Sequence, residues 1–139
     1  MQPPIWNFIT TGENTGAFNM QYDEMLVQQL IVSGISTVRL YRWKPWAISL
    51  GHNKNPLDID VQRCSHSGID VVRRPTGGRA ILHAEELTYS VVMRVEHEGI
   101  KHVYNEISEA LVVGLRLFGI EVSLQRTQPN FAEMYKSPS

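Results

Sequence analysis

The sequence predicts an α/β protein of the α+β kind, in which a mixed, largely antiparallel β-sheet is flanked by helices. Three observations favour this fold class. Several short runs rich in β-branched residues are separated by turn residues, as strands are. Two longer segments, residues 17–32 and residues 102–118, carry apolar side chains at helical spacing. The chain has 139 residues, 42% of them apolar and 19% charged, which is enough for one globular domain with a core.

A strand, a loop and a helix are expected before residue 35. Residues 5–9 alternate loosely and predict a strand, and residues 10–16 are dense in turn residues and predict a loop. The helix over residues 17–32 ends at Gly34, because glycine commonly follows the last turn of a helix. Its apolar side chains fall on one face, which we expect to cover the core. These side chains are Phe18, Tyr22, Met25, Leu26 and Leu30.

The next segment predicts a hairpin and a short helix. Residues 37–43 alternate cleanly, Pro45 lies in a turn, and residues 46–51 are expected to be the partner strand. A short helix is expected over residues 57–67. It contains Cys64, which we expect to be a small buried apolar residue, because a free cysteine usually is.

Residues 69–92 read as three short strands joined by tight connections. The apolar runs are residues 69–72, 80–83 and 87–92. Further along, the spacing predicts the helix over residues 102–118, then a last strand over residues 120–125 and a polar loop or tail over residues 126–139.

A glycine-rich bend, residues 73–79, lies between the first two of these runs. Gly77 and Gly78 are bracketed by Arg73, Arg74 and Arg79. Glycine amides flanked by guanidinium groups suit a phosphate or a polarised carbonyl. Three arginines so close together should also repel one another unless an anion lies between them. The alternative is a hairpin turn with arginines that face the solvent.

The string RRPTGGRAILHAEELTYS closely resembles the signature of the lipoate-protein ligase and octanoyltransferase family, which is related to the biotin protein ligases. Arg79 and the Glu-Leu-Thr-Tyr-Ser run resemble the cysteine-dependent octanoyltransferase branch. Ala84 departs from the family pattern, in which an aspartate commonly follows the histidine, so no carboxylate partner is predicted for His83. The resemblance implies a truncated fold like that of the class II biotin and lipoate ligases. Residues 1–125 would form the N-terminal part of its catalytic domain.

The resemblance implies octanoyl transfer from acyl carrier protein to a lysine of a lipoyl domain, without a cofactor. An ATP-dependent lipoate-protein ligase that uses ATP and Mg is the alternative within the family. A non-catalytic module that binds an acyl group or anion, and that could complement a separate C-terminal segment, is the alternative of another class. The residues expected to bind substrate are Arg73, Arg74, Gly77, Gly78, Arg79, Ala80, Ile81, Leu82 and His83.

No catalytic residue is identified in the sequence. In the octanoyltransferase branch the nucleophilic cysteine and a Gly-x-Lys-x-x-Gly-Ser-like motif come after the part of the domain that resembles this chain, and neither is found here. The resemblance gives Cys64 no catalytic role. We therefore expect the isolated chain to be inactive in acyl transfer.

The overall composition argues against several other classes. The formal net charge of −1 predicts no general attraction to nucleic acid or to a membrane surface. The five histidines and one cysteine show no metal-ligand spacing. A single cysteine and a start without a basic, apolar leader predict a cytoplasmic protein.

Overall fold

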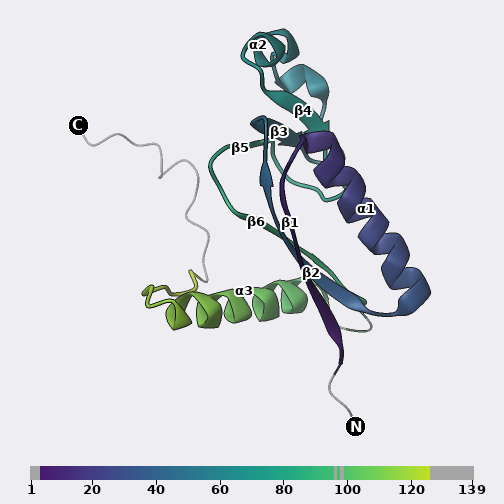
Figure 1. Cartoon of the computed structure of the whole chain (residues 1–139), viewed down its shortest axis with the longest axis vertical. Helices are drawn as coiled ribbons and strands as arrows, with labels where there is room; N and C mark the ends of the chain where they lie inside the picture. The colour runs from purple at the N-terminus through teal and green to yellow at the C-terminus, as the bar shows by residue number, and fades with distance from the viewer. Residues whose placement is uncertain (1–3, 96, 98, 126–139) are drawn as a thin grey trace. The chain divides into compact units, whose positions relative to one another are not determined.

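The structure is a computed structural model that describes residues 4–95, 97 and 99–125. Two three-stranded sheets have the strand orders β1-β2-β6 and β4-β3-β5 (Figure 1). The α/β class, with mixed sheets and flanking helices, is confirmed. The elements are β1 (Trp6–Asn14), α1 (Gly16–Ser33), β2 (Ser36–Trp43), β3 (Ala47–Leu50), the 3-10 helix η1 (Pro56–Asp58), α2 (Val61–His66), β4 (Asp70–Arg73), β5 (Ile81–His83), β6 (Thr88–Val92) and α3 (Ile100–Leu117).

Parallel and antiparallel pairs occur once each in both sheets. β2 runs parallel to β1 and antiparallel to β6, while β3 runs parallel to β4 and antiparallel to β5. The chain divides into two compact units, Met1–Arg94 and Val95–Ser139. The first unit holds both sheets, and the second holds α3. No helix in the described part of the chain is long and apolar enough to cross a membrane.

The first strand is longer than predicted. β1 pairs with β2 as far as Asn14, so the loop expected over residues 10–16 is wrong for residues 10–14. The register shifts between Thr10 and Gly12, and Gly12 has a φ of 70°. The turn residues therefore mark a bulge inside a strand, because glycine allows the backbone conformation that a bulge requires.

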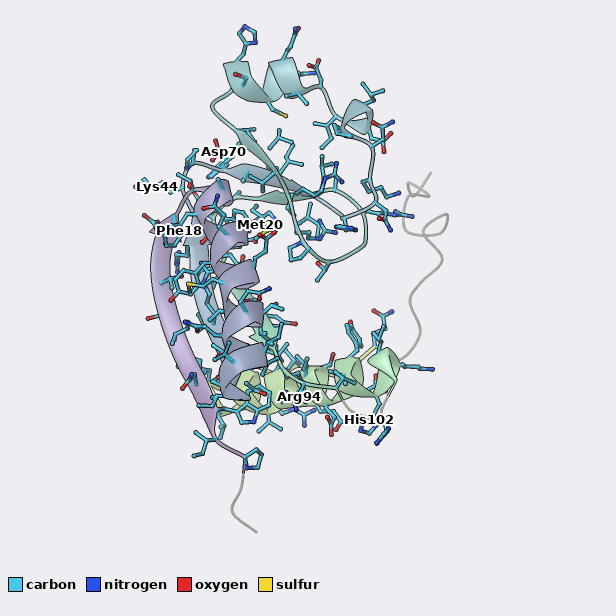
Figure 2. All side chains as sticks on the ribbon, turned by 90° about the vertical axis from the view of Figure 1, so that its right-hand side faces the viewer. Phe18, Met20, Lys44, Asp70, Arg94 and His102 are labelled. Carbon is cyan, nitrogen blue, oxygen red and sulfur yellow. The ribbon has the colours of Figure 1, made fainter. Side chains whose placement is uncertain are left out.

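The predicted helix α1 is present, and Gly34 ends it as predicted. Thr15 accepts a hydrogen bond from the Phe18 amide at 3.2 Å, and Gly34 ends the helix with a φ of 71°. Its buried face is only partly the predicted one, because Leu26 and Leu30 are buried as predicted but other predicted residues are not. Phe18 and Met20 leave the helix on opposite sides (Figure 2); Phe18 is 42% exposed and Met20 only 7%. Met25, also predicted to face inward, is 40% exposed.

Polar residues of α1 face inward because a buried arginine requires them. Arg39 of β2 is 0% exposed, and its Nη1 donates to Asp23 Oδ1 at 2.8 Å. Its Nη2 donates to Asn19 Oδ1 at 2.6 Å. The guanidinium carbon lies 3.9 Å from the centroid of the Tyr41 ring. Burial and the neighbouring Asp23 carboxylate both raise the pKa of the Tyr41 hydroxyl, which stays a hydrogen-bond donor to Asp23.

The predicted hairpin of residues 37–51 does not form. β3 pairs with β4 and β5, so the chain moves into the other sheet after Trp43. The strands at residues 70–73 and 81–83 likewise do not pair with each other, because β3 lies between them. Alternation of apolar residues located these strands, but it does not specify which strands pair.

The short helix and the last strand also differ from the prediction. The segment at residues 57–67 is divided into η1 and α2, because Asp60 Oδ1 accepts from the Arg63 amide at 2.9 Å and starts a new helix. Cys64 is buried, as predicted. Residues 120–125 form no strand; the Ile120 amide donates to the Leu115 carbonyl at 3.1 Å. The predicted tail over residues 126–139 lies outside the described residues.

Candidate functional site

The glycine bend connects β4 to β5 and lies at the end of β3. The Arg74 amide donates to the Leu50 carbonyl at 2.9 Å, and the His52 amide donates to the Thr76 carbonyl at 2.9 Å. Because β3 separates β4 from β5, the bend spans the width of that strand. The simple hairpin turn considered for this loop is therefore wrong.

Arg74 holds the bend to β3. Its Nη1 donates to the carbonyl and the hydroxyl of Ser49 at 2.8 and 3.0 Å. Its Nη2 donates to the carbonyls of Gly77 and Arg79 at 2.9 and 2.7 Å. Partial burial lowers the pKa of Arg74, but a guanidinium remains protonated at neutral pH and can only donate. Arg74 thus fixes the path of the backbone on both sides of Gly78.

Arg73 points to a different loop. Its Nη1 donates to the carbonyls of Gly51, His52 and Lys54 at 3.0, 2.8 and 2.9 Å. Carbonyl oxygens therefore surround the charges of Arg73 and Arg74, and no anion is needed to keep these two arginines in the same loop. The alternative of solvent-facing arginines is wrong for Arg74, which is half-buried, whereas Arg73 remains exposed while it binds these carbonyl oxygens. The third arginine, Arg79, is an exposed residue.

The glycines of the site differ in their surroundings. A Cβ added to Gly51 would lie 2.1 Å from the Gly78 carbonyl oxygen, so the two backbones touch. Gly78 has a φ of 108°, and a Cβ there would lie 2.8 Å from Arg74 Nη2. A Cβ on Gly77 would meet no atom within 4 Å. Gly51 is therefore required by close backbone packing and Gly78 by its backbone conformation, whereas the backbone at Gly77 is open.

The strand that follows the bend exposes apolar side chains. Ala80 is exposed, Ile81 is 46% exposed and Leu82 is 52% exposed. His83, at the end of the same strand, is only 7% exposed. The open backbone at Gly77 is thus followed in the chain by a strand with exposed apolar side chains.

His83 is hydrogen-bonded through both ring nitrogens. Its Nε2 lies 2.8 Å from Ser49 Oγ, and its Nδ1 lies 2.6 Å from Glu86 Oε1. Thr88 donates to the same oxygen of Glu86 at 2.7 Å and accepts from Trp43 Nε1 at 2.8 Å. The contacts form one chain of side chains, called here the His83 relay. Its members are Arg74, Ser49, His83, Glu86, Thr88 and Trp43.

The structure supplies a carboxylate partner that the sequence did not predict. Ala84 cannot pair with His83, but Glu86 reaches back to it across a tight turn. Partial burial raises the pKa of Glu86, yet the hydrogen bonds from His83 and Thr88 outweigh burial and hold that pKa below its ordinary value. Glu86 therefore stays ionised at neutral pH.

Ser49, His83 and Glu86 have the connectivity of a hydrolytic triad, but the geometry excludes that use. Ser49 is 0% exposed and its hydroxyl already accepts from Arg74. A nucleophile must reach its substrate, and this oxygen cannot. Cys64 is also buried. In the described part of the chain no group of three side chains is arranged to hold a metal ion.

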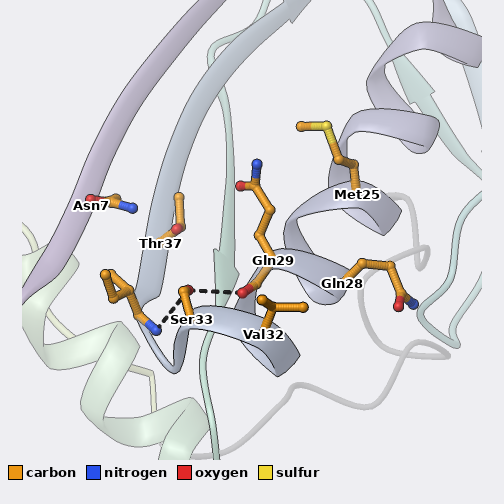
Figure 3. A pocket seen from close by; sticks show the side chains of 8 residues that line it. Asn7, Met25, Gln28, Gln29, Val32, Ser33 and Thr37 are labelled. Carbon is orange, nitrogen blue, oxygen red and sulfur yellow. Dashed lines mark hydrogen bonds between the residues drawn. The ribbon is translucent and has the colours of Figure 1, made fainter.

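Among the residues that the structure describes, the hollows in the surface of the first unit include two of similar size. One, of about 450 Å³, adjoins the His83 relay. Its lining residues are Glu13, Arg42, Trp43, Lys44, Trp46, Ala84, Glu85 and Glu86. The other, of about 510 Å³, lies between the end of α1 and the starts of β1 and β2 (Figure 3). None of the predicted site residues lines either hollow.

Sequence reasoning missed Ser49 and Glu86. Ser49 lies in an apolar strand and looks like an ordinary strand residue. Glu86 begins the Glu-Leu-Thr-Tyr-Ser run, and its position three residues after His83 is the sequence feature that could have indicated the pair.

Comparison with known proteins supplies further findings. Residues 15–130 match the model of the family described as the lipoyl protein ligase A/B catalytic domain. The octanoyltransferase LipM of Carboxydothermus hydrogenoformans is 38% identical over 96% of this chain and 53% of its own length. The octanoyltransferase LipM of Bacillus subtilis is 36% identical over 99% of this chain and 52% of its own length. The chain thus spans about half the length of these curated relatives.

Solved structures show the same fold. A bi-partite lipoate protein ligase from Thermoplasma acidophilum is 24% identical, with a TM-score of 0.77 over 89% of this chain and 49% of that chain. A lipoate-protein ligase A bound with ATP is 23% identical, with a TM-score of 0.76 over 84% of this chain and 48% of that chain. At these identities the likeness concerns the fold alone.

Proposed function

The chain belongs to the lipoyl protein ligase A/B catalytic domain family, and we propose that it forms the acyl-binding wall of an octanoyltransferase of protein lipoylation. The octanoyl group would pass from the thioester of acyl carrier protein to a lysine of a lipoyl domain. Support comes from the relatives named octanoyltransferase LipM, which are 36–38% identical over nearly the whole chain. The reaction would take place in the cytoplasm, where thiols stay reduced.

The observation that carries the proposal is the uncovered backbone of Gly77 beside the uncovered side chains of β5. Arg74 holds the bend in one shape, so little ordering is left for a ligand to impose. The bend would receive the carbonyl end of the acyl group, with Arg79 beside it. The alkyl chain would run beside residues 80–82, against one of the exposed side chains of Ile81 and Leu82, which point to opposite faces of β5, and burying that chain would supply most of the affinity.

In this proposal the predicted site residues divide into two roles. Arg73, Arg74 and Gly78 shape the bend through backbone contacts. Gly77 and the residues from Arg79 to Leu82 lie beside the ligand. His83 supports the site from the buried side through the His83 relay. No residue is assigned as the nucleophile, because the only cysteine, Cys64, is buried. We expect this chain to bind octanoate and not to transfer it.

Calorimetry with octanoate tests the proposal through Gly77. A leucine there would enter open space, so the fold should survive while the side chain occupies the ligand position. We expect Gly77→Leu to weaken octanoate binding at least about tenfold. Gly99→Leu is the matched control, because a Cβ on Gly99 also meets no atom within 4 Å and Gly99 lies far along the chain from the bend. Equal binding by the two variants, or none by the unaltered chain, would contradict the proposal.

A nucleotide requirement separates the proposed reaction from ATP-dependent ligation. We propose that no cofactor is used, because the relatives at 36–38% identity are named octanoyltransferases. Calorimetry with ATP and Mg should show no binding, and octanoyl transfer by the complete enzyme should proceed without ATP. Transfer that occurs only with ATP and Mg would instead assign the ligase reaction.

A non-catalytic acyl-binding subunit is the second candidate, favoured by the burial of the only cysteine. The two candidates differ in their partners. An octanoyltransferase should bind both octanoyl acyl carrier protein and a lipoyl domain, and NMR titration of the chain with each would measure this. Binding of free octanoate without binding of either protein would favour the second candidate.

A further inference from the structure

We infer that Glu86 is a positioning residue, whose carboxylate fixes the proton of His83 on Nδ1 and, through Ser49 and Arg74, sets the shape of the glycine bend. The proposed function places the acyl carbonyl of the substrate at the glycine bend, and only the biological meaning of the inference rests on that proposal. The inference itself is drawn from hydrogen bonds between residues of this chain.

The direction of each hydrogen bond follows from the donors available. Arg74 can only donate, so Ser49 Oγ accepts from it at 3.0 Å. The single hydroxyl proton of Ser49 is then directed to His83 Nε2, at 2.8 Å. An ionised carboxylate can only accept, so His83 Nδ1 carries the proton that it donates to Glu86 at 2.6 Å, and in the neutral imidazole Nε2 is then the acceptor from Ser49. In this arrangement of a neutral His83, every donor of the three contacts meets an acceptor.

The other side of the carboxylate is fixed in the same way. Trp43 Nε1 can only donate, so the Thr88 hydroxyl accepts from it and donates its own proton to Glu86. Trp43 also stacks on His83, with ring centroids 4.0 Å apart and the planes 11° from parallel. The imidazole is thus held in its plane while Glu86 determines which nitrogen carries the proton.

Removal of the Glu86 carboxylate would affect the glycine bend through the hydrogen bonds of the His83 relay. Without Glu86, the proton of His83 can move to Nε2, and Ser49 Oγ would then face two donors, Arg74 and His83. The proton of Ser49 would have no acceptor in the relay, so the contact between Arg74 and Ser49 should weaken. Arg74 also holds the carbonyls of Gly77 and Arg79, and the bend should loosen with it.

Glu85 provides the matched control. It neighbours Glu86 in the sequence, lines the same hollow and is exposed, but it takes no part in the His83 relay. A general loss of negative charge would therefore act equally at both positions, whereas control of the His83 proton belongs to Glu86 alone.

The test is 15N NMR of the histidine ring nitrogens together with amide hydrogen exchange, both on the whole 139-residue chain. We expect the unaltered chain to carry the His83 proton on Nδ1. Glu86→Ala should lose this tautomer and speed exchange of the His52 amide, which donates to the bend at Thr76, about tenfold. Glu86→Gln should restore both readouts, because its amide oxygen can accept from Nδ1. Glu85→Ala should match the unaltered chain.

A second variant keeps the inference testable if Glu86→Ala does not fold. Ser49→Ala cuts the path beyond His83, so it should speed exchange of the His52 amide while the proton stays on Nδ1. A His83 proton on Nε2 in the unaltered chain, or an unchanged tautomer and His52 exchange in Glu86→Ala, would overturn the inference. Octanoate is not used in this test, so its result is independent of whether the proposed function holds.

Discussion

At the scale of single residues, the most consequential side chain outside the site is Arg39. It is buried, hydrogen-bonded to Asn19 and Asp23, and covered by aromatic rings. A buried ion pair adds little net stability over a well-packed apolar pair, but the loss of one partner leaves a charge without compensation. This pair also explains why α1 turns polar residues toward the core.

Substitution of Arg39 should therefore destabilise the chain. We expect Arg39→Met to lower the free energy of unfolding by about 3–5 kcal/mol, because Asp23 is left buried without its cation. Urea unfolding followed by tryptophan fluorescence measures this. The control is Lys44→Met, which removes the exposed pair with Glu13 at 3.5 Å and should cost less than about 1 kcal/mol. Similar costs for both variants would show that the buried pair has no special role.

Glu86 should make stability depend on pH. Its pKa is lower in the folded chain, so its contribution is present above the unfolded pKa of about 4.3 and is lost as the pH falls through the folded pKa. We expect the difference in unfolding free energy between the unaltered chain and Glu86→Gln to shrink between about pH 6 and pH 3. Urea unfolding at several pH values measures it, with Glu85→Gln as control. A difference that does not change with pH would contradict the assignment.

At the scale of elements, the sequence predicts a helix or strand correctly where residues at its own ends determine those ends. Helix α1 ends at Gly34 as predicted, because Gly34 acts on neighbouring backbone groups, and Thr15 caps its start in the same local way. The pairing of β3 was not predictable, because the apolar pattern of residues 47–50 fits a partner in either sheet. The Glu86–His83 contact was missed for a related reason: it depends on a turn that folds residue 86 back onto residue 83.

Close backbone packing between the end of β3 and the glycine bend gives a prediction at this scale. We expect Gly51→Ala to cost about 1–3 kcal/mol of stability, because its Cβ would lie 2.1 Å from the Gly78 oxygen and the bend would have to move. Protection of the His52 amide should fall as well. Gly77→Ala is the control and should change stability by less than about 0.5 kcal/mol, since its Cβ enters open space. Full His52 protection in Gly51→Ala would show that the contact is not needed.

At the scale of the whole molecule, the core belongs to one of the two units. Among the residues that the structure describes, all buried ones lie between Gly16 and His83, inside the unit that ends at Arg94, and α3 has no buried residue. The sequence predicted α3 from its apolar stripe, but a stripe alone does not show what covers it. Stability should therefore reside in residues before 95.

Truncation tests this division. We expect a chain that ends at Arg94 to keep the urea midpoint of the full chain to within about 0.5 M, since it retains every side chain seen buried in residues 4–95, 97 and 99–125. The three tryptophans, Trp6, Trp43 and Trp46, all remain to report the transition. A truncated chain without a cooperative transition would show that residues 95–139 contribute to the core.

The hydrogen bonds that Arg73 and Arg74 donate have a consequence for how this segment can evolve. Apart from the Ser49 hydroxyl, both guanidinium groups recognise peptide oxygens, which every amino acid provides. Positions such as His52 and Lys54 can therefore drift in sequence while the loops keep their paths. The arginines themselves cannot drift, because a lysine offers one compact ammonium where a planar fork is needed.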